Sequence, residues 1–207
     1  MLIGTIGAGH IGGTLARLFV EAGHTVAVSN SRGPASLVEL VDELGRQASA
    51  VTVEDAARYG EIVVVSIPFG RYRDVPREQL AGKVVIDTNN YYPQRDGNFD
   101  ELDDGTLTSS ELLQAHLVDA RVVKALNTLN WQKLQTFARL PGHPERVAVP
   151  IAGDDAAAKN AASHLIDDIG FDAVDAGPLA RGRLLQPGTD VYGAVVPADE
   201  MRAQLGL

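Results

Sequence analysis

The chain of 207 residues has no cysteine. Disulfide bonds, thiolate nucleophiles and cysteine-ligated metal sites are therefore excluded. Long hydrophobic runs are also missing, because no apolar stretch approaches the roughly 20 residues that a membrane-spanning helix needs. A glycine interrupts the first apolar stretch too early for a signal peptide. We therefore expect a cytoplasmic protein with no membrane partner.

Basic residues are in deficit. The chain has 18 lysines and arginines against 27 acidic residues, and its formal net charge is −9. A protein of this charge is a poor partner for nucleic acid or for an anionic membrane. An anionic ligand must instead be held by local arginine or lysine side chains and by helix ends, since the overall field would repel it.

The N-terminal segment carries a glycine-rich motif between two apolar runs. Residues 2–6 are apolar, residues 7–12 read Gly-Ala-Gly-His-Ile-Gly, and residues 25–28 form the second run. In a G-x-G-x-x-G turn the glycines permit the sharp turn, the approach to a pyrophosphate and the packing of the helix, whose N-terminus attracts phosphate. This order predicts a dinucleotide-binding unit. The expected contacts are Gly7, Gly9, His10, Ile11 and Gly12, with His10 lining the backbone rather than acting as a catalyst.

Acidic residues are absent between Glu21 and Glu39. NAD-specific units place an acidic residue about 20 positions after the glycines, where it binds the ribose hydroxyls. The end of the second predicted strand here carries Ser29, Asn30, Ser31 and Arg32. A guanidinium can form charge-assisted hydrogen bonds with a phosphate, and a carboxylate at this place would repel it. The segment therefore predicts NADP(H) as the cofactor.

The remaining chain alternates apolar and helical segments. Strands are expected at residues 50–53, 61–68, 84–87 and 120–125, with further α/β segments beyond residue 129. This alternation predicts an α/β fold with a doubly wound parallel Rossmann sheet and a small C-terminal α/β extension. We expect an NADP(H)-binding domain over 1–128 and a smaller region over 129–207 that completes the substrate cleft. The loops after the strands, at 68, 88–90 and 127–128, should line that cleft.

Residues 89–106 show no helical or strand period and contain five acidic residues by position 104. We expect a solvated acidic lid, because long irregular segments in compact domains are commonly functional or mobile. The spacing of its aspartates matches no calcium loop, so no metal site is expected. Tyr91 and Tyr92 either stack on a flat acceptor or cover the cleft. Arg181 and Arg183 either hold an anionic substrate tail or are solvated.

The chain resembles the NADPH:coenzyme F420 oxidoreductases, which transfer hydride between NADP(H) and a 5-deazaflavin. The segments that carry the resemblance are residues 7–12, 29–32, 66–68, 87–89, 123–128 and 175–179. The resemblance implies that Ser31 and Arg32 hold the 2′-phosphate. It also implies cofactor contacts from Ile67, Pro68, Asn89, Ala125 and Asn127, with Asn127 near the nicotinamide. The sequence departs from the family at Leu126, where an aromatic residue is expected, and in its acidic 96–104 loop.

No Ser/His/Asp, Lys/Tyr or paired-carboxylate arrangement stands out among the cleft loops, so we name no catalytic side chain. Hydride transfer between two stacked rings needs placement above all. We therefore expect an enzyme, an NADP(H)-dependent oxidoreductase with coenzyme F420 as co-substrate. The alternatives are an NADPH-dependent reductase of a carbonyl, imine or flavin, with Lys124 as the acid, and a non-catalytic NADPH sensor. Lys124 is better explained by pairing with a carboxylate. A homodimer that completes a pocket with its partner chain is plausible.

Overall fold

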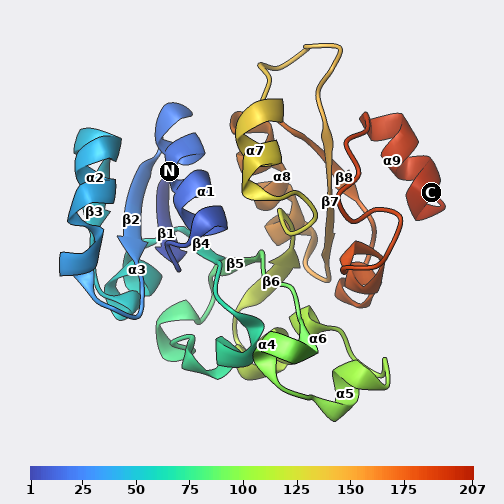
Figure 1. Ribbon diagram of the computed structural model, residues 1–207, viewed down its shortest axis with the longest axis horizontal. Helices are drawn as coiled ribbons and strands as arrows, with labels where there is room; N and C mark the ends of the chain where they lie inside the picture. The colour runs from blue at the N-terminus through green and yellow to red at the C-terminus, as the bar shows by residue number, and fades with distance from the viewer.

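The computed structural model describes residues 1–207 and has an eight-stranded sheet at its centre (Figure 1). The strand order is β3-β2-β1-β4-β5-β6-β7-β8. The strands are β1 Leu2–Ile6, β2 Thr25–Ser29, β3 Ala48–Ala50, β4 Ile62–Val65, β5 Val84–Asp87, β6 Arg121–Lys124, β7 Ala148–Gly153 and β8 Asp172–Asp175. The first six are parallel, β7 runs antiparallel to β6, and β8 is parallel to β7. The predicted Rossmann-type α/β fold is confirmed.

Nine α-helices surround the sheet. They are α1 His10–Glu21, α2 Val38–Leu44, α3 Val53–Tyr59, α4 Pro93–Asp96, α5 Asp100–Asp103, α6 Ser109–His116, α7 Trp131–Phe137, α8 Ala156–Asp168 and α9 Ala198–Leu205. Short 3-10 helices occupy Pro34–Leu37, Gly45–Gln47, Phe69–Asp74, Glu78–Leu80 and Leu179–Leu185. In Figure 1 the short helices α4, α5 and α6 lie together in green, beside the carboxyl end of β5.

The central strands are buried on both faces. In β4, Ile62 and Val64 belong to a core cluster with α1, α7 and α8, whereas Val63 and Val65 belong to a second cluster with α3, α6 and the 69–74 segment. Successive side chains of a strand point to opposite faces, so a doubly covered strand needs apolar residues at every position. This explains the continuous apolar runs in the sequence.

The strand order reverses beside β1. The chain winds from β1 through β2 to β3 on one side and then crosses to β4 on the other. In open parallel sheets such a reversal leaves a crevice beyond the carboxyl ends of the strands. The loops that follow β1 and β4 therefore flank a crevice, and the glycine-rich turn lies at its centre.

One predicted strand is displaced, and one helix was not predicted. The strand expected at residues 50–53 is β3 at Ala48–Ala50, and Val53 already belongs to α3. The reason is a helix cap, since the Thr52 hydroxyl accepts a hydrogen bond from the Asp55 backbone N–H at 3.1 Å. Helix α9 was not predicted. Its Met201 and Leu205 are buried in a third cluster against β7 and β8.

Residues 89–106 are more ordered than the predicted lid. The segment forms α4 and α5, and its aromatic rings pack on the body of the protein. The Phe69 ring lies 5.4 Å from Phe99 and 5.9 Å from Tyr91, between ring centroids, both edge to face. Burial of these rings anchors an otherwise acidic segment. The irregular conformation expected for this segment is therefore wrong, because the sequence pattern does not reveal this long-range packing. Its acidic residues at 100, 101, 103 and 104 are exposed, as a solvated segment requires.

The C-terminal region continues the sheet. Val123 and Lys124 of β6 pair with Gly153 and Ala152 of β7. The division at residue 128 into two regions stays a prediction. No helix is long and apolar enough to cross a membrane.

Candidate functional site

The glycine-rich turn has the geometry that a dinucleotide needs. Gly7 has a φ of +105°, and a Cβ there would lie 2.0 Å from the Ser66 carbonyl oxygen. A Cβ on Gly12 would lie 2.0 Å from the Gly7 carbonyl oxygen, so this position requires glycine for helix packing. A Cβ on Gly9 would meet nothing within 4 Å, which leaves its backbone open to a ligand. No side chain caps α1, so the N–H groups of its first turn remain available to an anion.

A hollow of about 320 Å³ lies at the carboxyl ends of β1 and β2. Among its lining residues are Gly7, Gly9, Asn30, Ser31, Arg32, Ile67 and Pro68. Asn30 folds the loop, since its Oδ1 accepts from the Arg32 N–H at 2.9 Å and its Nδ2 donates to Ser36 at 3.0 Å. Ser31 and Arg32 are exposed. The predicted phosphate-binding side chains therefore stand free at the rim of the hollow.

Two residues that were predicted to contact the cofactor do not line this hollow. Ser29 is fully buried, and its hydroxyl donates to the Thr5 carbonyl at 2.7 Å. Ser29 is still part of β2, so its side chain points into the sheet rather than beyond its edge. Ala125 is likewise fully buried and lines neither hollow. The prediction that these two residues contact the cofactor directly is therefore corrected, because both are too buried to reach a ligand.

Arg71 and Asp74 also line the first hollow and were missed by the sequence reading. They belong to the 3-10 helix that follows β4, and they form an ion pair with each other. The rule that ligands bind beyond strand ends already pointed to this segment. The sequence predicts only a loop after Pro68, so neither Arg71 nor Asp74 was predicted to line the cleft.

A second hollow of about 340 Å³ continues from the first. The two share Gly9, Ser66, Ile67 and Pro68. The second is also lined by His10, Ile11, Thr88, Asn89, Asn90, Tyr92, Arg95, Leu126, Asn127, Leu129, Asn130, Trp131 and Tyr192. Trp131 stacks on His10, with ring centroids 5.3 Å apart. Together the hollows form one cleft along the carboxyl ends of β1, β4, β5 and β6.

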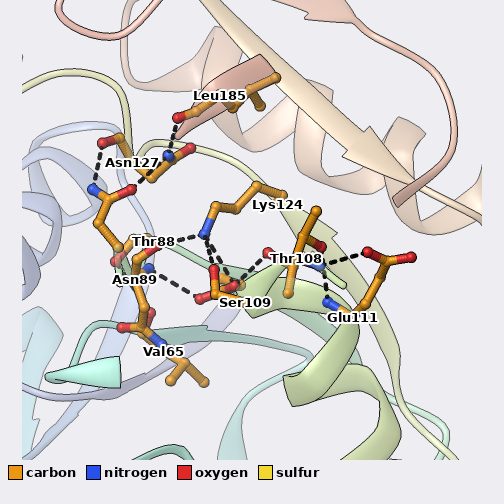
Figure 2. Close-up of polar contacts among 12 residues, drawn as sticks. Val65, Thr88, Asn89, Thr108, Ser109, Glu111, Lys124, Asn127 and Leu185 are labelled. Carbon is orange, nitrogen blue, oxygen red and sulfur yellow. Dashed lines mark hydrogen bonds and ion pairs between the residues drawn. The ribbon is translucent and has the colours of Figure 1, made fainter. Parts of the chain in front are cut away.

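Two buried amides in the second hollow carry hydrogen-bonding atoms without a protein partner. Asn89 Oδ1 accepts from the Ile67 N–H at 2.8 Å, and its Nδ2 has no partner. Asn127 Nδ2 donates to the Leu185 carbonyl at 2.7 Å (Figure 2), and its Oδ1 has no partner. An N–H only donates and a carbonyl only accepts, so both amide orientations are determined by the network. Two residues that line the hollow therefore carry one unpaired donor and one unpaired acceptor, both buried and of known polarity.

The backbone at Leu126 helps to place this acceptor. Leu126 follows β6 and has a φ of +59°, the only positive φ outside glycine. Such a conformation is uncommon in a residue with a side chain and is found preferentially at functional sites. The turn buries the Leu126 side chain and places Asn127 at the hollow.

Lys124 lies beneath the cleft and does not line it. Its ammonium is 3.3 Å from Asp87 Oδ2 and 3.5 Å from the Ser109 hydroxyl, and it also donates to the Asn89 carbonyl (Figure 2). The Asp87 carboxylate accepts from the Asn89 N–H at 2.9 Å and from Ser110 at 2.7 Å. The predicted pairing of Lys124 with a carboxylate is confirmed. Its three donors are engaged below the cleft, so it is badly placed to protonate a substrate.

Two tyrosines from distant parts of the chain meet in the second hollow. The hydroxyls of Tyr92 and Tyr192 are 2.8 Å apart, and both side chains are half-buried. Burial, and then the hydrogen bond with Tyr92, raises the pKa of Tyr192 well above its ordinary value. Tyr192 was missed because nothing in the sequence connects it with residue 92. Tyr91 instead turns away to Asp103, at 2.7 Å.

The two arginines considered for an anionic tail lie elsewhere. Arg181 donates to the Leu205 carbonyl at 2.6 Å, and Arg183 donates to the Ala180 carbonyl at 3.1 Å. Neither lines either hollow. Arg95 is the arginine that reaches the second hollow, where it lies 5.0 Å over the Tyr92 ring and pairs with Asp96.

Comparison with known proteins agrees with this geometry. Residues 2–91 match the family described as NADP oxidoreductase, coenzyme F420-dependent. No curated protein matches the chain. A hypothetical protein from Sinorhizobium meliloti has a similar structure, with a TM-score of 0.82 and 29% identity over 95% of each chain. A candidate F420-dependent NADP reductase from an Arthrobacter species has a TM-score of 0.74 and 26% identity, over 88% of this chain and 86% of that one.

Longer dehydrogenases share the fold alone. The 3-hydroxyisobutyrate dehydrogenase of Mycobacterium tuberculosis has a TM-score of 0.60 and 14% identity, over 86% of this chain and 55% of its own. The family match includes the glycine motif, the 29–32 segment and the strand ends at 66–68 and 87–89. The resemblance found in the sequence is confirmed over that segment, and the chain is an NADP-dependent oxidoreductase.

Proposed function

We propose that this NADP-dependent oxidoreductase transfers hydride between NADP(H) and a 5-deazaflavin of the coenzyme F420 type. The observation that carries the proposal is the continuity of the two hollows through Gly9 and residues 66–68. Ser31 and Arg32 would hold the 2′-phosphate, the start of α1 would hold the pyrophosphate, and the second hollow would hold the nicotinamide.

The unpaired amide atoms support this placement of the nicotinamide. Its carboxamide has one N–H₂ group and one carbonyl oxygen. Asn127 Oδ1 would accept from the N–H₂ group and Asn89 Nδ2 would donate to the oxygen. Buried polar atoms left unpaired cost about 1–3 kcal/mol each, so pairing them stabilises the bound cofactor. Trp131 and His10 then form an aromatic wall where a flat acceptor can stack.

An absorbance assay tests the acceptor. Coenzyme F420 and NADPH are mixed with the enzyme, and the deazaflavin absorbance is followed over a broad pH range. We expect the absorbance to bleach as NADPH is consumed. An inert mixture at every pH would contradict the deazaflavin proposal, and a mixture without enzyme is the control.

A second candidate is a reductase of a small carbonyl or imine. The hydroxyl pair of Tyr92 and Tyr192 favours it, because such a substrate needs a proton donor in the cleft. The same assay with a small ketone and a cyclic imine, followed by NADPH absorbance, separates the two candidates. A sensor without catalysis would be expected to have its cleft filled by packing, whereas the second hollow is open beside Trp131.

A further inference from the structure

The wall of the second hollow contains a hydroxyl hydrogen that forms no hydrogen bond within the protein. Tyr92 and Tyr192 each carry one hydroxyl hydrogen, and their mutual bond of 2.8 Å uses one of them. Neither hydroxyl has any other hydrogen-bond partner in the protein. The pair therefore keeps one donor for a ligand, next to the hollow that both residues line.

Both phenols are held in place by contacts with neighbouring residues. The Tyr92 ring lies under Arg95, and the Tyr92 N–H donates to the Asp96 carboxylate at 2.9 Å. On the other side, the N–H of Gly193 donates to the Thr128 carbonyl at 2.8 Å, and Lys133 donates to the Gly193 carbonyl at 2.6 Å. Tyr192 is thus tied to the strand end that carries Asn127. A donor fixed before the substrate arrives costs little reorganisation during the reaction.

The Tyr192 phenol keeps its hydrogen under ordinary conditions. Burial raises the pKa of Tyr192, and Tyr92 adds to that effect. The nearby cation Arg95 is paired with Asp96, at 2.8 Å. Tyr192 therefore has a hydroxyl hydrogen to donate across the physiological pH range.

We propose that the Tyr92–Tyr192 pair, on the wall of the second hollow, is the proton donor to the hydride acceptor. This inference rests on the proposed function. In that reaction hydride leaves C4 of the reduced nicotinamide and forms a new C–H bond at C5 of the deazaflavin. NADPH is oxidised and the deazaflavin is reduced. The electron pair displaced by the hydride moves to the N1–C2 carbonyl edge. N1 takes a proton that passes from solvent through the two phenol hydroxyls, each of which gains one hydrogen as it gives up another, so that no phenolate is left.

The test compares Tyr92→Phe, Tyr192→Phe and the double variant with the wild type. NADPH and coenzyme F420 are mixed at saturation in a stopped-flow instrument, and NADPH affinity is measured separately by fluorescence. General acids contribute about 10²–10⁴-fold. We therefore expect the slower of the two single variants to reduce the deazaflavin at least about 100-fold more slowly than the wild type. Residues that act as a unit are non-additive, so the double variant should be no slower than that single variant.

Two further readouts separate catalysis from a structural effect. NADPH affinity should stay within about twofold of the wild type, and the solvent isotope effect of the wild type should vanish in the double variant. Tyr59→Phe is the matched control, because Tyr59 is 61% exposed and lies outside the cleft. Multiplicative losses in the double variant, or an unchanged solvent isotope effect, would overturn the proposal.

The outcomes distinguish this inference from the proposed function. If the wild type and all three variants reduce coenzyme F420 at one rate, the function stands and the phenol pair is overturned. If the wild type does not reduce coenzyme F420, the deazaflavin is overturned, and the same variants are assayed with a small ketone and a cyclic imine. The same order of rates among the wild type and the three variants, with either acceptor, supports the phenol pair as the proton donor. A wild type that reduces none of these acceptors overturns it.

Discussion

At the scale of single residues, cofactor choice depends on Arg32. Its side chain is exposed at the rim of the first hollow, next to Ser31, and Asn30 fixes the turn that presents it. The protein's net charge of −9 disfavours a bound phosphate in general. A local guanidinium must outweigh that field, and no carboxylate occupies the end of β2 to oppose it.

Replacing Arg32 by alanine should therefore weaken NADPH binding and leave NADH binding nearly unchanged. We expect a loss of about 1–3 kcal/mol for NADPH, the usual range for a charge-assisted hydrogen bond. Fluorescence titration with both cofactors measures it, and the wild type should bind NADPH at least about tenfold tighter than NADH. Arg46→Ala is the matched control, because Arg46 is exposed and lines neither hollow. Equal losses for both cofactors would argue against a contact with the 2′-phosphate.

At the scale of elements, α6 supports the cleft from below. Its first residues, Ser109 and Ser110, contact the buried pair of Lys124 and Asp87, and that pair holds Asn89. The helix begins with a reciprocal cap, visible in Figure 2. The Thr108 hydroxyl accepts from the Glu111 N–H at 3.2 Å, and the Glu111 carboxylate accepts from the Thr108 N–H at 2.7 Å.

Removing this cap should destabilise the protein. Thr108→Ala should lower the free energy of unfolding by about 1 kcal/mol, whereas Thr108→Ser keeps the hydroxyl and most of the stability. Urea denaturation of the wild type and both variants gives the comparison. A serine variant as unstable as the alanine variant would show that the methyl group, rather than the hydrogen bond, is responsible.

At the scale of the whole molecule, His24 connects the N-terminus of the chain with the end of α8. It precedes β2, its Nδ1 lies 3.3 Å from the N-terminal ammonium, and its Nε2 lies 3.2 Å from Asp168 Oδ2 at the end of α8. Burial, and then the positive N-terminus, lowers the pKa of His24, and the Asp168 carboxylate only partly offsets this.

This pKa makes stability depend on pH. The unfolded chain takes up the His24 proton at a higher pH than the folded chain, so stability falls as the pH drops through the unfolded value of about 6.5. His24→Gln removes the titration. As the pH falls from about 7.5 to about 5.5, we expect the free energy of unfolding to decrease more for the wild type than for this variant. Urea denaturation across this range measures it, and a constant difference would contradict the prediction.

A homodimer in which the C-terminal region completes a pocket stays a prediction. Tyr192 of the same chain already lines the second hollow.

The sequence by itself determined what local spacing encodes. The glycine turn, the strand-end residues Ser31 and Arg32, and the doubly covered strands follow from patterns within some thirty residues, where backbone geometry and side-chain alternation leave few alternatives. Those features were enough for the fold and the class of cofactor.

Only the tertiary structure decided which side chains share the cleft. Ser29 ends β2 and Ala125 directly follows β6, and both proved to be buried, because the sheet is covered on both faces. Tyr192 reached Tyr92 across a hundred residues, and packing of Phe99 ordered a segment that looked irregular. Contacts of this kind depend on how distant elements pack, and no local period in the chain records them.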